Sequence, residues 1–333
     1  MAAQRFDVLG IGNAIVDVIQ RAEEDFLHAH KIQRGSMTLI DEPRAESLYA
    51  AMSAPVTASG GSAANTIAGL ASLGSSCAYI GKVRGDKLGK LFTSDIRGLG
   101  AHFETPHAAS GPSTARCLIV VTPDGERSMS TYLGACQQLS PADVDAEAVS
   151  AADVTYLEGY LWDPPAAKEA FRRAADIAHA AGRKAALTLS DSFCVDRYRA
   201  EFLELMRSGR VDIVFANAHE ARALYGTSDF SEALACLRRD VRLAVVTRSE
   251  LGSLAATADE VVHVNAFPAE KILDTTGAGD LFASGFLHGF TRGFHLGDSL
   301  KLGGYAAAEA IGQIGPRPPA GLKARAAAAG LRV

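Results

Sequence analysis

The sequence predicts an α/β protein with a mostly parallel sheet and a second, smaller β-sheet. Strand-like apolar runs alternate with helical stretches over most of the 333 residues, which is typical of parallel strands joined by crossover helices. Two groups of short strands interrupt this alternation. The length suffices for one large domain with a small addition. We therefore expect helices on both faces of the main sheet, with the small sheet attached.

Each element of the main part is predicted from an apolar run or a helical pattern. The strands are expected at residues 6–11, 77–81, 154–158, 185–189, 211–215, 243–247 and 261–264. Helices are expected at residues 62–73, 87–99, 166–181, 218–225 and 231–239, and the apolar run 281–287 indicates a buried helix. The tail after residue 320 is rich in Ala and Arg and should form a helix or a loose end.

Two insertions are predicted to form the small sheet. Residues 14–20 pair with 35–41, and residues 113–121 pair with 127–133 through the turn Pro123-Asp124-Gly125-Glu126. These four strands would cover a site on the main part. We therefore divide the chain into a main α/β domain and a small β lid; the main domain takes residues 1–13, 42–104 and 135–333, and the lid takes residues 14–41 and 105–134.

Composition narrows the class of protein. The net charge of −5 and the pI of about 6.0 leave no basic surface for nucleic acid. No apolar run approaches the ~20 residues that span a membrane, and the first residues lead straight into a strand, so we expect no signal peptide. The five cysteines are scattered and odd in number, which favours reduced thiols over disulfides or a zinc cluster. We expect a cytoplasmic enzyme with neither nucleic acid nor membrane as partner.

The segment Asp274-Thr275-Thr276-Gly277-Ala278-Gly279-Asp280 carries the strongest chemical signal. Its glycines let the backbone approach a ligand, and the amides that open the following helix would bind an anion. A carboxylate such as Asp280 should repel a phosphate, unless it takes a proton from a hydroxyl that attacks that phosphate. The segment therefore predicts phosphoryl transfer to an alcohol. The alternative is an ordinary loop in which Asp280 caps the helix.

Two further segments supply polar groups for a substrate. Gly60 and Gly61 precede a small-residue helix that carries Asn65, whose amide offers a donor and an acceptor. The first strand releases Asn13 and Asp17 at its exit, and a short carboxylate there suits two neighbouring sugar hydroxyls. A solvated turn residue is an equal alternative for Asp17.

Together these segments resemble the ribokinase-like (PfkB) family of sugar and nucleoside kinases over almost the whole chain. Residues 274–280 match every fixed position of the family signature D-T-x-G-A-G-D, and residues 60–74 match its Gly-Gly signature. Within the family, the Gly-x-Gly-Asn strand end, the segment Asp25-Phe26-Leu27 and the spacing from Gly61 to Asn65 are most similar to adenosine kinases. The resemblance implies a ribokinase-like α/β/α domain whose β lid excludes water from the site.

The resemblance also implies roles for the motif residues. Asp280 would be the base, and the amides of Ala278, Gly279 and Asp280, with Gly277, would form the anion hole for the phosphoryl group. Asp274 and Thr276 would lie near a monovalent cation, K⁺. Asn217 and Glu220 would position Mg²⁺ through water, or serve as a helix cap and a first-turn carboxylate.

ATP would occupy the C-terminal half. Residues 243–255 resemble a strand–turn–strand segment in which Thr247, Ser249 and Gly252 contact the nucleotide. Arg248 would either reach a phosphate or be solvated, and the sequence does not favour one of these alternatives over the other. The loop after residue 264 and a helix at 303–312 would enclose the adenine, and Tyr305 would pack in the core.

The acceptor site is expected from residues that the resemblance places around a ribose and a base. Asp17, Gly61 and Asn65 would hold ribose hydroxyls, with Asn13 and Gly60 close by. The base slot would be lined by Tyr160, Phe193, Ile15 and Leu133. The second aromatic of the related strand end is replaced by Leu161, with Trp162 displaced by one position, and Asp191 adds a polar group.

The expected reaction is transfer from ATP to the 5′-hydroxyl of adenosine, giving AMP as in purine salvage. The alternatives are another nucleoside (inosine, guanosine or cytidine), a sugar (ribose, fructose or 2-keto-3-deoxygluconate), or a sensor without catalysis. A dinucleotide fingerprint fails because Ile15 stands at its third glycine, and no P-loop motif occurs. The expected partners are ATP and the small acceptor, and the expected assembly is a monomer or homodimer.

Overall fold

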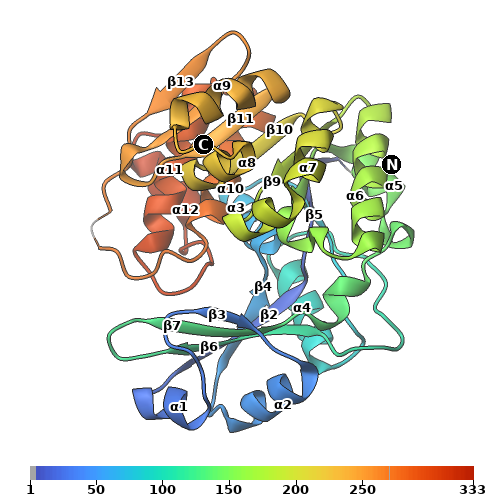
Figure 1. Cartoon of the computed structure of the whole chain (residues 1–333), viewed down its shortest axis with the longest axis vertical. Helices are drawn as coiled ribbons and strands as arrows, with labels where there is room; N and C mark the ends of the chain where they lie inside the picture. The colour runs from blue at the N-terminus through green and yellow to red at the C-terminus, as the bar shows by residue number, and fades with distance from the viewer. Residues whose placement is uncertain (1–4, 270) are drawn as a thin grey trace.

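The computed structural model describes residues 5–269 and 271–333 and contains two sheets (Figure 1). The larger sheet has eight strands in the order β13-β12-β11-β10-β9-β8-β1-β5, and the smaller has five in the order β3-β7-β6-β2-β4. In Figure 1 the small sheet lies below the main body, with the helices α1 and α2 on its far side.

The large sheet is parallel over six strands, because helical crossovers join them. The last two strands, β12 and β13, are antiparallel to their neighbours. The strands are β1 (Phe6–Ile11), β5 (Cys77–Ile80), β8 (Ala152–Glu158), β9 (Lys184–Thr188), β10 (Ile213–Asn217), β11 (Leu243–Thr247), β12 (Ser253–Ala256) and β13 (Val261–Val264).

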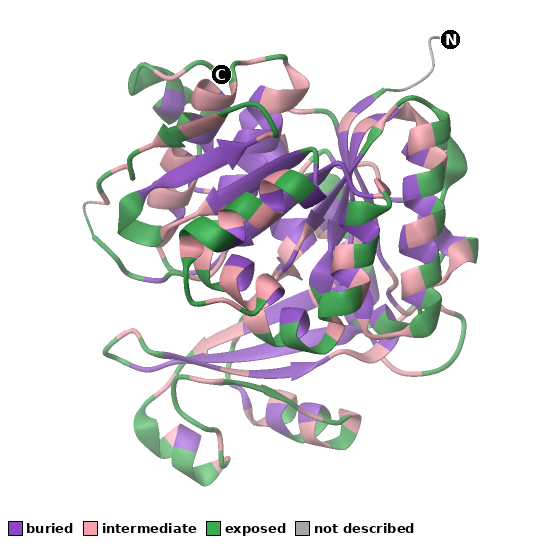
Figure 2. Ribbon diagram, turned by 45° about the horizontal axis from the view of Figure 1, so that its top comes forward, coloured by how far each residue is buried: buried purple, intermediate pink, exposed green. Residues whose placement is uncertain are grey.

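Helices cover both faces of this sheet. One apolar core joins the sheet to the first group, α5 (Ala146–Ala151), α6 (Pro165–Ala180), α7 (Ser192–Arg207), α8 (Ala218–Tyr225) and α9 (Phe230–Asp240). A second core joins the other face to α3 (Ser62–Leu73), α4 (Lys87–Gly98), α10 (Ala278–Thr291) and α11 (Leu296–Ile311), against which α12 (Leu322–Ala328) packs. The purple strands between half-green helices in Figure 2 show this layering.

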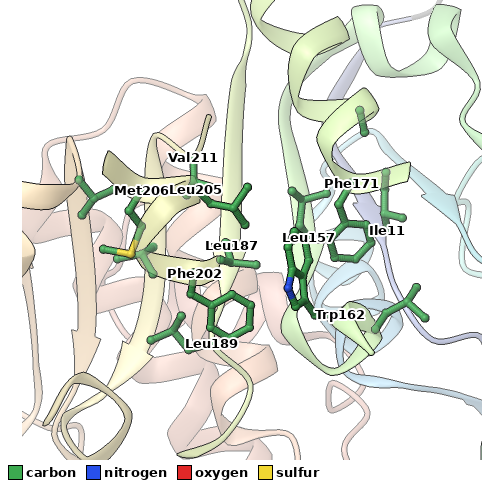
Figure 3. Packing of buried hydrophobic residues seen from close by; sticks show 14 of the residues in the cluster. Ile11, Leu157, Trp162, Phe171, Leu187, Leu189, Phe202, Leu205, Met206 and Val211 are labelled. Atoms are coloured by element: carbon green, nitrogen blue, oxygen red, sulfur yellow. The ribbon is translucent and has the colours of Figure 1, made fainter. Parts of the chain in front are cut away.

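Trp162 lies in the first core and therefore does not line the predicted base slot. Its ring centroid is 5.8 Å from that of Phe171 and 5.9 Å from that of Phe202 (Figure 3). Leu161 is also fully buried. Neither residue therefore compensates for the missing second aromatic of the base slot.

The small sheet differs from the prediction in two respects. Its strands are β2 (Ile15–Arg21), β3 (Met37–Leu39), β4 (Val56–Gly60), β6 (Ala115–Val121) and β7 (Arg127–Tyr132). The prediction of four strands from two insertions is wrong, because β4 comes from the range 42–104 that we assigned to the main domain and pairs with β2. The pairing of residues 14–20 with 35–41 is also wrong. β2 instead pairs with β6 and β3 with β7, since α1 (Glu24–Ala29) intervenes between β2 and β3.

Most other elements agree with the prediction within two residues. β10 begins two residues later than expected, and the helix expected at 303–312 is the second half of α11. The sequence analysis missed α1, α2 (Glu42–Ala51), α5 and α7. The apolar residues of α7 occur irregularly, and the helix is distorted at Tyr198. The short 3₁₀ turns are η1 (Gly134–Gln138), η2 (Pro141–Asp143), η3 (Gly159–Trp162) and η4 (Ser249–Leu251).

Candidate active site

A cavity of about 620 Å³ opens between the small sheet and the carboxyl ends of the parallel strands. Ligands of open α/β sheets bind at this edge, because loops and helix N-termini converge there. Fifteen of the sequence-predicted site residues line the cavity: Asn13, Ile15, Asp17, Gly61, Asn65, Leu133, Tyr160, Phe193, Asn217, Glu220, Thr247, Thr276, Gly277, Gly279 and Asp280. The lining does not include Gly60, Ser249, Gly252, Asp274 or Ala278.

Asp280 lies in the first turn of α10, beside the start of α3. Its carboxylate accepts hydrogen bonds from Ser62 Oγ at 2.6 Å and from Asn65 Nδ2 at 3.1 Å. Burial raises the pKa of Asp280 to about 6, although both hydrogen bonds lower it. The two helices come this close because Gly69 of α3 faces Ser284 of α10, where a Cβ would meet the serine oxygen at 2.3 Å. Asp280 is thus oriented by two donors and points into the cavity.

The backbone before α10 has unused amides. Gly277 has φ +79°, and a Cβ there would meet Pro316, so the chain needs glycine at this turn. A Cβ at Gly279 would meet no atom within 4 Å, because this residue borders the cavity. The amide of Ala278 donates to the carbonyl of Thr275 at 3.2 Å, so in this structure it has a partner within the protein. Among the described residues the amides of Gly277, Gly279 and Asp280 have no such partner, and amides free at a helix N-terminus can bind an anion.

Asp17 lies on β2 at the border of the two sheets and is buried. Burial raises its pKa to about 6, while Arg317 and Arg127 lower it. A Cβ on Gly60 would meet the Asp17 carboxylate at 2.4 Å, so this glycine makes room for the side chain. Nearby, the buried Asn65 Oδ1 has no hydrogen-bond partner within the described part of the chain. An unpaired acceptor is costly unless a ligand donates to it, and the position suits a hydroxyl.

The predicted base slot has one aromatic wall and one aliphatic wall. Tyr160 and Phe193 are 38% and 64% exposed and come from the main domain. Arg197 stacks on Phe193 with its guanidinium carbon 4.6 Å from the ring centroid. Ile15 and Leu133 lie across the cavity, together with small-sheet residues that the sequence analysis did not name: Met37, Leu39, Ile119 and Met129.

Asn217 and Glu220 form a capping box at the start of α8, which confirms the alternative role given to them. Asn217 Oδ1 accepts from the amides of His219 and Glu220 at 2.8 Å each, and Glu220 accepts from the Asn217 amide at 2.9 Å. Burial raises the pKa of Glu220 to about 7. Both side chains line the cavity, so capping leaves them accessible to a ligand.

The segment 243–255 brings one of its three predicted residues to the cavity, Thr247 at the end of β11. Gly252 is explained by the chain itself, because a Cβ there would meet the Val264 carbonyl oxygen at 2.0 Å. Arg248 stacks over Phe230 at 4.8 Å from the ring centroid. Tyr305 packs edge-on against Phe267 of the loop after β13.

Asp274 binds three groups of the protein. Its carboxylate pairs with the buried Arg127 and accepts from the amides of Thr276 at 2.9 Å and Gly315 at 2.8 Å. Burial raises the pKa of Asp274, but the two amides and the Arg127 charge outweigh this and hold the pKa below its usual range. Arg127 belongs to β7 of the small sheet, so this pair joins the two parts of the molecule.

Four functional candidates escaped the sequence analysis. Ser62 and Glu158 contact the predicted site residues, and the guanidinium groups of the buried Arg127 and the half-buried Arg317 lie near Asp17. Arg127 Nε and Nη2 and Arg317 Nη1 have no partner among the described residues. Arg127 could have been found from the sequence, because a charged residue in a strand that is expected to be buried is unusual. Arg317 could not, because it follows the end of a helix in a segment rich in Gly and Pro.

In the described part of the chain, no helix combines the length and apolar character needed to cross a membrane.

Comparison with known proteins identifies the class. The sequence model of the pfkB family carbohydrate kinases matches residues 30–321. This chain belongs to the PfkB carbohydrate kinase family. PfkB proteins with solved structures include an adenosine kinase from Sinorhizobium meliloti, which is 58% identical, with a TM-score of 0.90 and coverage of 98% of this chain and 100% of that one. A probable sugar kinase from Rhizobium etli CFN 42 is 56% identical, with a TM-score of 0.91 and coverage of 98% and 99%.

A third PfkB relative carries another name. The bifunctional ribokinase/ribose-5-phosphate isomerase A of Fructilactobacillus sanfranciscensis is 29% identical over 67% of this chain, and the match spans 40% of that longer protein. This chain is accordingly a phosphotransferase of the sugar and nucleoside kinase class, and the names of its relatives divide between nucleosides and sugars.

Proposed function

We propose that this kinase transfers the γ-phosphoryl group of ATP to the 5′-hydroxyl of a nucleoside, with adenosine as the favoured acceptor and AMP as the product. One observation carries the proposal: Asp280, Gly277 and Gly279 of the anion motif, Asp17 and Asn65 line one cavity together with the aromatic rings of Tyr160 and Phe193. This combination offers a base, an anion site, groups for ribose hydroxyls and space for a purine ring.

The transfer follows from these groups. The ribose hydroxyls bind Asp17 and the free Asn65 Oδ1, which places the 5′-oxygen beside Asp280. Asp280 takes the proton of that hydroxyl as its oxygen forms a bond to the γ-phosphorus, and the bond to the leaving oxygen breaks with its electron pair on ADP. The amides of Gly277, Gly279 and Asp280 stabilise the negative charge of the moving phosphoryl group. No phosphoenzyme is formed.

The residues present fit Mg²⁺ as the companion of ATP. Asn217 and Glu220 supply one amide and one carboxylate, a donor set that suits Mg²⁺ held mainly by phosphate oxygens and water. When bound, the ion neutralises phosphate charge. Thr247, the loop after β13 and α11 are the proposed nucleotide contacts, and the unpartnered nitrogens of Arg127 suit a phosphate oxygen. K⁺ near Asp274 and Thr276 is also proposed, although Arg127 already pairs with the Asp274 carboxylate.

A sugar kinase is the second candidate. The carboxylate of Asp191 lines the same cavity and suits a sugar hydroxyl, and the names of two relatives refer to sugar kinase and ribokinase activities. Another nucleoside, such as inosine, guanosine or cytidine, would use the same ribose contacts as adenosine.

The test is ADP release with ATP and Mg²⁺ over a panel of acceptors: adenosine, inosine, guanosine, cytidine, ribose, fructose and 2-keto-3-deoxygluconate. Preference for adenosine, by at least tenfold in kcat/KM, is the expected result. Preference for a free sugar would replace the proposed acceptor. Acceptor binding without any turnover would instead favour the sensor.

A further inference from the structure

Glu158 is a buried carboxylate that the proposed transfer does not use. It ends β8, the strand next to β1 in the large sheet, and is 1% exposed at the base of the cavity. A buried carboxylate is costly unless hydrogen bonds satisfy it. The hydrogen-bond partners of Glu158 therefore indicate its role.

The partners of Glu158 are donors from two different segments. Oε1 accepts from the Asn13 side-chain Nδ2 at 2.7 Å and from the Asn13 amide at 3.3 Å, and Oε2 accepts from the Ala63 amide at 2.8 Å. The chain leaves space for this arrangement at Gly12, where a Cβ would lie 2.3 Å from Oε2. One carboxylate thus fastens the exit of β1 to the first turn of α3.

Each segment held by Glu158 carries acceptor-site groups. Asn13 Nδ2 donates to Glu158, which orients the amide; Cys136 Sγ lies 3.0 Å from Asn13 Oδ1 and 2.7 Å from the Leu133 carbonyl oxygen, which share its proton. Ala63 lies between Ser62 and Asn65 in sequence, and these two residues donate to Asp280. A shift of the α3 N-terminus would therefore move both donors of the proposed base and the free Asn65 Oδ1 together.

We propose that Glu158 is a positioning residue of the transfer reaction, which holds Asn13 and the N-terminus of α3 in register and so aligns Ser62 and Asn65 with Asp280. This inference rests on the proposed function. Glu158 acts through these residues and not as the base. Both oxygens of Glu158 accept hydrogen bonds from N–H groups. A glutamine side chain in its place would direct its own NH₂ group at one of these donors.

The test is the isosteric substitution Glu158→Gln. We expect the acceptor KM to rise about tenfold and kcat to fall about tenfold, because a misplacement of about 1 Å at a reacting group can cost as much as 100-fold in rate. The KM for ATP should stay within about twofold, since the proposed nucleotide contacts lie on β11 and α11. If Glu158→Gln accumulates unfolded, Glu158→Asp carries the same expectations, because it withdraws the carboxylate by one methylene.

Asp212→Asn is the matched control. Asp212 is also buried and accepts a hydrogen bond from a backbone amide, that of Ala185 at 2.9 Å, but it lies just before the amino end of β10 and does not line the cavity. A merely structural role of Glu158 predicts that both variants lower Tm and leave both KM values unchanged, and that outcome overturns the proposal. A rise of the ATP KM equal to that of the acceptor also overturns it.

A double-mutant cycle provides a second readout. Ser62→Ala removes one donor of Asp280 directly, so the losses in kcat for Ser62→Ala and Glu158→Gln should combine to less than their product. Independent, multiplying losses would contradict action through Ser62. Both tests compare each variant with the wild type on whichever acceptor the panel identifies. Failure of nucleoside turnover in the wild type therefore counts against the proposed function alone.

Discussion

Asp280 illustrates how the surroundings of a single residue set its chemistry. Burial raises its pKa to about 6, and two donors keep it from rising further. A base with a pKa slightly below neutral is mostly ionised at pH 7 and still accepts a proton in the transition state. The alternative of a simple helix cap is not observed, because Gly277 is the N-cap of α10 and no side chain forms a cap hydrogen bond there.

The rate should depend on pH through Asp280. Its raised pKa means that the carboxylate becomes protonated, and so inactive as a base, when the pH falls through about 6. We expect log kcat to be level above pH 7 and to fall about tenfold per pH unit below pH 6, as for a single required base. Asp280→Asn should lower kcat by about 100-fold or more and abolish this limb while acceptor binding persists. A near-wild-type rate for that variant would exclude Asp280 as base.

Asp17 should act on binding more than on the chemical step. Asp17→Ala removes a buried charged acceptor of the proposed ribose contacts, and we expect the acceptor KM to rise about 10- to 100-fold, as for a lost hydrogen bond to a charged group. Steady-state kinetics with varied acceptor measure this. Asp124→Ala, in the exposed turn between β6 and β7, is the control and should leave KM unchanged. An unchanged KM for Asp17→Ala removes this residue from the acceptor site.

At the scale of elements, α10 serves both the core and the site. Its middle glycines face neighbouring backbone, since a Cβ on Gly285 would lie 2.6 Å from the Leu302 carbonyl oxygen of α11. Gly279, in the first turn, has no protein atom to accommodate. The same residue type therefore has a packing role at one position and, in the proposed reaction, a ligand role at the other.

This contrast predicts opposite effects for two substitutions in α10. Gly279→Ala should keep or raise Tm, because Ala in place of Gly favours a helix by roughly 0.5–1 kcal/mol, yet lower kcat at least about tenfold by filling the anion site. Gly285→Ala should lower Tm, because overpacking costs about 1–3 kcal/mol, and leave the acceptor KM unchanged. Thermal unfolding and kinetics of both variants check this. Full activity of Gly279→Ala would contradict the anion site.

At the scale of the whole molecule, two arginines join the small sheet to the main body. Arg127 of β7 pairs with Asp274 just before α10. Arg317 follows α11 and donates to the Ser59 carbonyl of β4, and it lies 3.2 Å from Asp95 of α4. Arg127 lines the cavity. Together the two links would stabilise the small sheet over a bound acceptor and help to exclude water.

Removal of one link should uncouple ATP hydrolysis from transfer. Arg317→Ala loosens β4, so we expect ADP release without acceptor to rise severalfold relative to acceptor-dependent release. Arg325→Ala is the control, because Arg325 pairs with Glu309 between α12 and α11, away from the small sheet. An unchanged ratio in Arg317→Ala would show that this contact does not control water access.

The sequence predicted the elements whose signals are local. Periodicity located α3 and α8 to the residue, and the glycine motif located the start of α10, because helix caps and turns depend on neighbouring residues. The prediction failed for β4, an edge strand of five residues with one exposed end, and for the partners of β2 and β3. Strand pairing depends on contacts between distant segments, which a single sequence does not record.

By itself, the sequence determined the α/β class, the anion motif and the residues that carry the proposed reaction, since each rests on residue type and local spacing. Only the tertiary structure placed Asp280 beside Ser62 and Asn65, assigned Trp162 to the core, brought Glu158 to the cavity and brought Arg127 and Arg317 near Asp17. These outcomes depend on which side chains from distant segments share a buried space, and burial and pairing together set their charge and orientation.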